Sequence, residues 1–204
     1  IVTKTVSDSR RDEVISRIRA QVAQGRQVYW VCPLIEESEA LDLGNATATH
    51  LELSAAMEGL CNADGTPLRV GLLNSRMPSV EKKAVMALFS AGLMGVLVST
   101  TVIEVGVDVP NASLMVIEHA ERFGLSQLHQ LRGRVGRGAA ASACVLMYSQ
   151  PEGGRLGEAS RDAKGEAADA FRKLGLSAKD FAGLNLDERF EIIMKKIKEL
   201  GLST

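Results

Sequence analysis

The stretch from Val96 to Gly138 constrains the fold most, because two strand-like apolar runs stand close to a loop rich in arginine and glycine. The first run, Val96–Val98, stops at three consecutive hydroxyl residues, and the second is Leu114–Ile117. The loop reads QLRGRVGRG and holds Arg132, Arg134 and Arg137. Guanidinium groups bind phosphate oxygens as a planar fork, and neighbouring glycines let the backbone approach closely. The stretch therefore predicts phosphate chemistry on an α/β scaffold; the alternative is a glycine-rich loop with solvated arginines.

Strand-like and helical patterns alternate through the first 150 residues. Strands are predicted at 1–6, 27–33, 68–73, 96–98, 114–117 and 143–148. A first amphipathic helix is indicated by Val14, Ile15, Ile18 and Val22, ending at Gly25. Alternating strands and helices favour right-handed crossovers and a mostly parallel sheet covered on both faces.

Two further helical regions carry more specific predictions. Glycines interrupt the pattern between Leu34 and Asn62, so two helices are expected there with a break near Gly44. Pro78 is predicted to open a helix that runs to about Ala91, because a proline at the first helical position loses no hydrogen bond. The residues expected to face inward on this helix are Val80, Ala84, Val85 and Leu88.

The sequence TTVIEVGVDVPNASLMVIE, followed by ERFGLSQLHQLRGRVGRG, resembles motifs V and VI of superfamily 2 helicases. Its wording is most similar to the RecG-type helicases of branched DNA, with the transcription-repair coupling translocases as the nearest relatives. The resemblance covers residues 1–150 and implies a RecA-like, three-layer α/β domain. It also implies an ATP-dependent DNA helicase or translocase that acts in repair and recombination.

The chain contains no G-x-x-x-x-G-K-[ST] motif, which cradles nucleotide phosphates in helicase motors. Under the resemblance, this chain is therefore the second motor domain alone. ATP and Mg²⁺ would be held mainly by an N-terminal motor domain of the same full-length protein, and the isolated chain would be inactive. DNA, branched or duplex, is the second expected partner. A non-catalytic interaction module that keeps the fold is the alternative from another class.

The resemblance assigns roles on the nucleotide side. Arg134 and Arg137 match the arginine fingers of motif VI, which stabilise charge on the γ-phosphate. Gln130 would contact the nucleotide, whereas Arg132 could instead pair within the domain. Gly106 and Asp108 match motif V positions near the ribose, although Asp108 also suits a plain turn before a proline. Surface salt bridges are the alternative for the arginines.

Nucleic-acid contacts are implied at the ends of two predicted strands. Ser99, Thr100 and Thr101 follow a strand, where open α/β sheets place ligands, and their hydroxyls suit phosphate contacts. Thr100 could also cap a short helix. Arg76 lies in Asn-Ser-Arg-Met, where the family usually has His-Gly-Arg-Met, so the arginine matches and its two neighbours depart from the pattern.

Composition excludes several other classes. The net charge of −1 does not by itself indicate nucleic acid, but a motor domain needs only a local basic stripe. The three cysteines have no metal-binding spacing, and Cys32 and Cys144 are expected as buried thiols in a reducing cytoplasm. His50, His119 and His129 are interpreted as structural, and no metal site is expected. No apolar run is long enough for a membrane, and the start at Ile1 suggests a fragment.

Residues 151–204 do not match the family and are predicted to form a helical tail of uncertain origin. A helix is suggested for 164–174. A second helix, ended by Gly201, carries a narrow apolar stripe, which is expected to pack on the domain, with docking of a partner as the alternative. The stripe consists of Leu186, Phe190, Ile193, Ile197 and Leu200.

Overall fold

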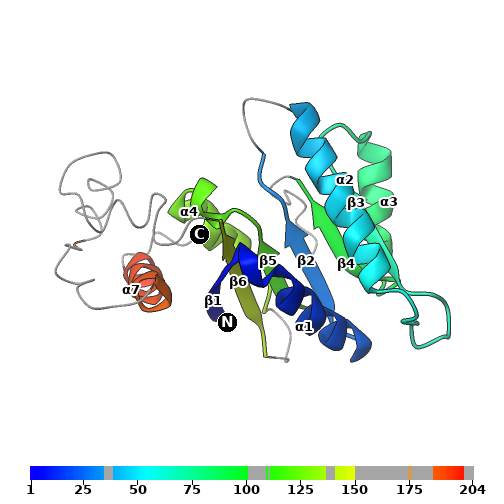
Figure 1. The fold of residues 1–204 in the computed structure, drawn as a ribbon, viewed down its shortest axis with the longest axis horizontal. Helices are drawn as coiled ribbons and strands as arrows, with labels where there is room; N and C mark the ends of the chain where they lie inside the picture. Colours follow the sequence, from blue (N-terminus) through cyan, green and yellow to red (C-terminus); the bar gives the residue numbers. More distant parts are fainter. Residues whose placement is uncertain are drawn as a thin grey trace.

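Six parallel strands form the central sheet, and helices lie on both of its faces (Figure 1). The structure is a computed structural model that describes residues 1–34, 39–100, 109, 111–136, 141–149, 175 and 186–199. The strands are β1 (Val2–Ser7), β2 (Gln27–Val31), β3 (Arg69–Leu73), β4 (Met94–Ser99), β5 (Ala112–Ile117) and β6 (Ala143–Tyr148). Their order is β1-β6-β5-β2-β4-β3, and every pairing is parallel. The predicted α/β fold is confirmed, and each predicted strand is present.

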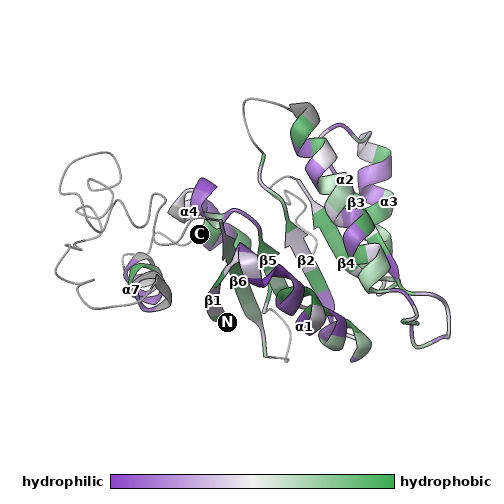
Figure 2. Ribbon diagram, in the orientation of Figure 1, coloured by the Kyte–Doolittle hydropathy of each residue, from purple (hydrophilic) through white to green (hydrophobic). Residues whose placement is uncertain are grey.

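Helices α1 and α2 pack on one face of the sheet, and α3, α4 and α7 belong to the other. Two hydrophobic clusters follow this division, one with α1 and α2 residues and one with α3, α4 and α7 residues. Figure 2 shows hydrophobic strands between helices of mixed hydropathy. The helices are η1 (Asp8–Arg10), α1 (Arg11–Ala23), α2 (Glu39–Ala56), α3 (Ser79–Ser90), η2 (Ala120–Arg122), α4 (Leu125–Arg132) and α7 (Leu186–Glu199).

Strands β2, β4 and β5 are buried along their whole length, as expected for central parallel strands with helices on both faces. Trp30 and Val98 face the α1 and α2 cluster, while Tyr29 and Leu97 face the opposite cluster. Alternate residues thus supply two cores from one strand. This explains why the sequence of these strands reads as a continuous apolar run.

The structure corrects two helical predictions. The break expected near Gly44 is absent, because α2 runs from Glu39 through Gly44 to Ala56. A helical glycine there costs some stability but does not have to end the helix. On α3, Val80 is 79% exposed and Ala84 is also exposed, whereas Met86 and Phe89 are buried. The helix is therefore rotated from the predicted orientation, although Val85 and Leu88 still contact the core.

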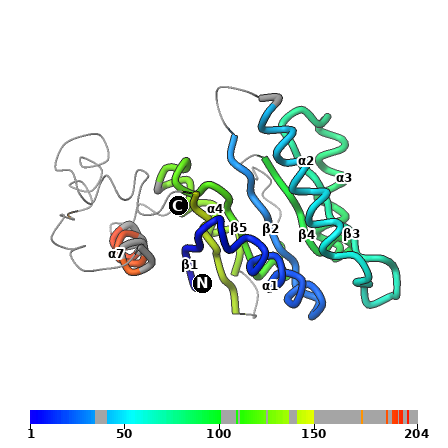
Figure 3. The backbone as a smooth tube through the Cα atoms, in the orientation of Figure 1, coloured from blue at the N-terminus to red at the C-terminus, as the bar shows by residue number. Residues whose placement is uncertain are grey.

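The C-terminal part of the chain is described only in α7 and at Gly175. Helix α7 occupies Leu186–Glu199 within the region of the predicted last helix, and Ile193 is fully buried in the cluster that also contains α4 residues. The suggested helix at 164–174 lies outside the described residues. Figure 3 traces β1 beside β6, so the strands that come first and last in the sequence are neighbours in the sheet. No helix in the described ranges is both long and apolar enough to cross a membrane.

Candidate functional site

The carboxyl ends of the strands form the edge at which several predicted site residues lie. The hydrogen bonding of the sheet continues there, since Cys32 N donates to Ser99 O at 2.8 Å and Thr100 N donates to Leu73 O at 3.1 Å. Neighbouring strands β2 and β5 lead to helices on opposite faces, to α2 and α4 respectively. A crevice at such a switch point is the usual ligand site of an open parallel sheet. A ligand is therefore expected to bind at this edge of the sheet.

Arg76 is exposed in the turn that follows β3, as a phosphate-contacting arginine needs to be. The side chain of Asn74 shapes this turn, because its Oδ1 accepts hydrogen bonds from Arg76 N and Met77 N, each at 3.1 Å. Lys82 Nζ donates to Ser75 O at 3.0 Å and ties the turn to α3. Asn74 and Ser75 replace the usual His-Gly of the motif, yet the turn still presents the arginine to solvent.

Ser99 and Thr100 occupy the predicted edge but their side chains do not reach solvent. Ser99 is 0% exposed and Thr100 is 1% exposed. Thr100 Oγ1 is also buried without a hydrogen-bond partner among the residues that the structure describes. In this conformation neither hydroxyl can touch a phosphate directly. The predicted contacts therefore require the edge to move, and they remain predictions together with those of Thr101, which lies outside the described residues.

The arginine loop lies at the opposite edge of the sheet. Arg132 is the last residue of α4, and its NH2 donates to the carbonyl of Ile1 at 3.1 Å, immediately before β1. Gly136 has φ +85°, and a Cβ there would lie 2.5 Å from Ser142 Oγ and 2.9 Å from Ile1 Cγ1. Only glycine fits this close turn beside the amino ends of β1 and β6. Arg132 thus has a structural role, as the sequence alternative allowed, although its partner is a carbonyl and not an acid.

Arg134 and Gln130 are carried by this loop and by α4. Leu128, Leu131 and Val135 are buried and fix the helix and loop on the sheet, while Gln130 is exposed and Arg134 is half-buried. This spacing leaves polar side chains facing outward between apolar anchors. Gly106, Asp108 and Arg137 lie outside the described residues. The guanidinium and amide groups of the described set fit a phosphate-bearing nucleotide, and no cluster of metal-ligating side chains occurs within the described ranges.

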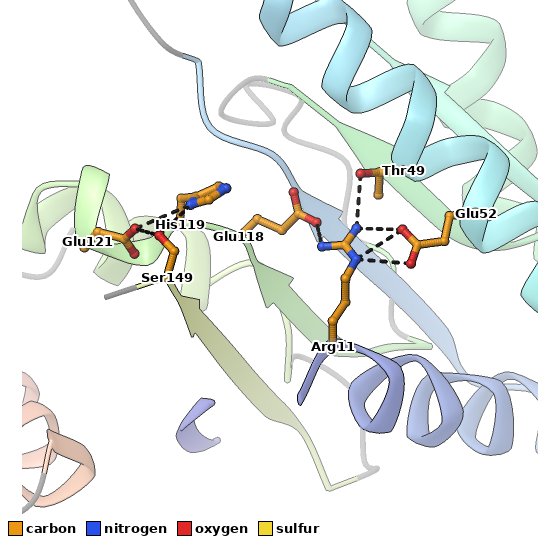
Figure 4. A network of polar contacts seen from close by, with 7 residues as sticks. All are labelled: Arg11, Thr49, Glu52, Glu118, His119, Glu121 and Ser149. Carbon is orange, nitrogen blue, oxygen red and sulfur yellow. Dashed lines mark hydrogen bonds and ion pairs between the residues drawn. The ribbon is translucent and has the colours of Figure 1, made fainter. Parts of the chain in front are cut away.

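A polar network at the β2–β5 switch point was not predicted from the sequence (Figure 4). At its centre, Arg11 binds Glu52, with Arg11 NH2 to Glu52 Oε2 at 2.9 Å, and its NH1 donates to Glu118 Oε1. Thr49 Oγ1 accepts from Arg11 NH2 at 3.3 Å. The guanidinium carbon also lies 5.1 Å from the ring centroid of Trp30, at cation–π distance. Arg11 thus links α1, α2 and the end of β5.

Charge and burial in this network shift two pKa values. Burial lowers the pKa of Arg11, but its bonds to Glu52 and Glu118 outweigh that effect and raise it. Burial, together with the nearby Glu118 charge, raises the pKa of the Cys32 thiol. Cys32, Asn45 and the network residues line a cavity of about 280 Å³. With its arginine paired to two carboxylates, this cavity offers no free cation for a phosphate. The predicted burial of Cys32 and Cys144 is confirmed.

Polar contacts with Ser149 stabilise the turn after β5, which contains His119 and Glu121. His119 has φ +47°, which is unusual for a residue with a side chain. Its Nδ1 lies 3.2 Å from Ser149 Oγ, which in turn donates to Glu121 Oε1 at 2.7 Å (Figure 4). His50 Nε2 lies 2.8 Å from Val70 O, so both histidines have local structural contacts. Burial and the charge of Arg132 lower the pKa of His129, whose Nδ1 is buried.

Residues 9–139 match the family described as the helicase conserved C-terminal domain. The ATP-dependent DNA helicase RecG of Acidithiobacillus ferridurans is 55% identical over 161 residues, which are 79% of this chain and 22% of that protein. RecG of Escherichia coli strain K12 is 56% identical over 152 residues, 74% of this chain and 21% of that protein. The chain therefore spans about a fifth of the length of these relatives.

Two solved helicase structures are also similar to this chain. A structure of RecG bound to a three-way DNA junction matches with a TM-score of 0.61 and 37% identity, over 97% of this chain and 22% of that one. Domain 2 of the DEAD-box helicase Mss116p, bound to an RNA duplex, matches with a TM-score of 0.53 at 14% identity, over 74% of this chain and 55% of that one. The second likeness concerns the fold alone.

Proposed function

Because the chain belongs to the family of helicase conserved C-terminal domains and is of RecG type, we propose that it is the second motor domain of an ATP-dependent helicase of branched DNA, acting in repair and recombination. Its partners are then a first motor domain of the same full-length protein and DNA. The observation that carries this proposal is the half-buried Arg134 between the apolar anchors of α4 and its loop. The high identity to RecG proteins supports it.

Arg134 and Arg137 act as the arginine fingers in this proposal. A bound nucleotide supplies the phosphoryl group, and its phosphate loop and magnesium ligands come from the first motor domain. Arg134 donates N–H groups to phosphate oxygens and stabilises negative charge that grows in the transition state. Gln130, exposed on α4, orients the nucleotide, and Gly106 and Asp108 approach its ribose. Leu128, Leu131 and Val135 hold the loop so that little reorganisation is needed.

DNA follows the carboxyl edge of the sheet. Arg76 binds a backbone phosphate, and Ser99, Thr100 and Thr101 contribute once the edge opens. Thr101 on the DNA side is only a few residues from Gly106 and Asp108 on the nucleotide side in the sequence. Such positioning contacts carry no sequence information, so the domain should not prefer particular base sequences.

Steady-state ATP hydrolysis tests the proposal. The 204-residue chain alone should show no activity, because the phosphate loop is absent from it. In the full-length protein, Arg134→Ala should lower kcat by roughly 10³-fold or more, the effect typical of an arginine finger, with DNA binding nearly unchanged. Arg69→Ala, which removes an exposed arginine at the start of β3, is the matched control and should leave kcat unchanged.

Two results would contradict the proposal. One is DNA-stimulated ATP hydrolysis by the isolated chain that disappears in Arg137→Ala. The other is an Arg134→Ala variant of the full-length protein that hydrolyses ATP at the wild-type rate.

A further inference from the structure

A groove of about 450 Å³ lies between α1 and the outer half of the sheet, and its lining reaches Val2 and Ser142 at the amino ends of β1 and β6. Its floor is formed by one face of β1, β6 and β5, and its wall by one flank of α1. The apolar lining residues are Val2, Val6, Val14, Ile18, Leu114 and Val145. In β1, Val2 and Val6 alternate with inward-facing Thr3, so they point to the same face of the sheet. This surface is named the α1 groove.

No helix in the described part of the chain covers the α1 groove. Helix α2 packs on β3 and β4, at the other end of the same face. Helix α7 contacts β1, but its Ile193 belongs to the hydrophobic cluster of the opposite face. Val2 is consequently 57% exposed although it lies in a strand. Both faces of a parallel sheet are normally covered by helices. Within the described ranges, only α1 borders this half of the face.

The rim of the α1 groove is strongly basic. Four cations line it, namely Lys4, Arg10, Arg17 and Arg26, against the single carboxylate of Glu13. Arg10 and Arg17 share that carboxylate, at 2.8 Å and 3.4 Å, and their side chains remain 56% and 69% exposed. The chain has a net charge of −1, yet basic side chains are concentrated around this apolar surface. A partner that fits this surface needs one apolar side and one acidic side.

We propose that the α1 groove docks an acidic amphipathic helix of a partner protein. Its apolar stripe would cover Val2, Val6 and Val145, and its acidic flank would pair with Arg10 and Arg17. Arg10 caps the start of α1 and Arg17 lies seven residues later on that helix, about 10 Å along its axis, so carboxylates at the same spacing on a neighbouring helix can face both. The inference does not depend on ATP hydrolysis or DNA binding.

Two other occupants fit less well. Residues 150–185 of this chain carry six acidic and six basic side chains, so that segment has no net charge to match the rim. Nucleic acid matches the rim charge but not the floor, where aliphatic side chains replace the aromatic platforms and polar groups that usually contact bases and phosphates. The acidic helix satisfies both the floor and the rim.

The test uses the 204-residue chain and a synthetic peptide of about 20 residues, long enough for roughly 30 Å of helix. The peptide carries leucines along one face and glutamates on the other; the control peptide has lysine in place of every glutamate. Amide chemical shifts should change in β1 and α1 with the acidic peptide only. Arg10→Glu combined with Arg17→Glu should weaken binding at least tenfold. Lys83→Glu with Lys195→Glu, the same charge change on α3 and α7, should not.

The remaining outcomes overturn the proposal. Equal binding of both peptides would show that charge does not select the partner. Absence of binding, or shifts confined to another surface, would show that an acidic helix does not fit this groove. Concentration-dependent dimerisation that protects the same β1 and α1 amides would assign the groove to a second copy of the chain.

Discussion

Arg11 replaced by methionine should lower the free energy of unfolding by about 3 kcal/mol, because a nearly buried carboxylate loses its cation. Glu118 is 7% exposed and is bonded to Arg11, which also holds Glu52 and Thr49. Methionine preserves most of the aliphatic volume, so the loss reports the charge and not a cavity. Urea unfolding followed by circular dichroism gives the difference.

Arg10→Met is the matched control, since the neighbouring arginine pairs with Glu13 on the surface. An exposed ion pair three residues apart contributes little to stability, so Arg10→Met should change the free energy of unfolding much less than Arg11→Met does. If both variants lost the same stability, the network at the switch point would have no more weight than a surface ion pair.

At the scale of single residues, the sequence indicated which side chains belong to the candidate site. It indicated less well which groups surround each side chain and how deeply it is buried. Arg76 is predicted to contact a backbone phosphate after a strand, and its side chain is exposed there, as that contact requires. The Arg11–Glu118 pair was not predicted, because its partners are 107 positions apart and a helix pattern treats Arg11 as one more surface arginine. The burial of Thr100 was equally invisible, since a hydroxyl at a strand end looks the same whether it faces water or a neighbouring strand.

Helix α1 approaches the sheet closely at Gly95 of β4, and this contact depends on the absence of a side chain. A Cβ at Gly95 would lie 2.6 Å from Val22 Cγ1 and 2.8 Å from Leu68 Cδ2. Gly95→Ala should therefore push α1 outward and cost about 1–3 kcal/mol of unfolding free energy, as other overpacked cores do. Thermal and urea unfolding measure the loss.

Gly44→Ala, the same chemical change on α2, should have the opposite sign. A Cβ at Gly44 meets no atom within 4 Å, and alanine is the better helix former, so a gain of about 0.5–1 kcal/mol is expected. A loss of stability at Gly44 would mean that α2 is not continuous there.

The elements themselves were largely predictable, because apolar runs of β-branched residues marked every strand. The helix faces were less so. Val80 and Ala84 fitted an apolar spacing on α3, but the register that buries Met86 and Phe89 fills more core volume and prevails. Local spacing thus identified the helix, and packing against the sheet decided its rotation.

The 204-residue chain should bind nucleic acid weakly and without sequence preference, because Arg76 and the Thr100–Thr101 turn are expected to supply only a few phosphate contacts. Each neutralised phosphate contributes about −0.9 to the slope of log K against log salt on duplex DNA. A shallow slope is expected, and Arg76→Ala should reduce its magnitude by about 0.9 for every sequence tested. Fluorescence anisotropy at several salt concentrations measures both quantities. Discrimination between sequences, or tight binding at high salt, would show a different interface.

Pairing of β1 with β6 has a consequence for how the domain forms during synthesis. Val2 is in register with Ala143, so β1 cannot pair with β6 until nearly the whole domain has left the ribosome. Contacts this distant in sequence slow folding, because a long loop must close first. Strands β2, β4 and β5 can assemble earlier and serve as a template, while the nascent β1 offers an unpaired backbone edge to other chains. The last strand therefore completes the sheet and also ends the interval in which the newly made chain is most prone to aggregate.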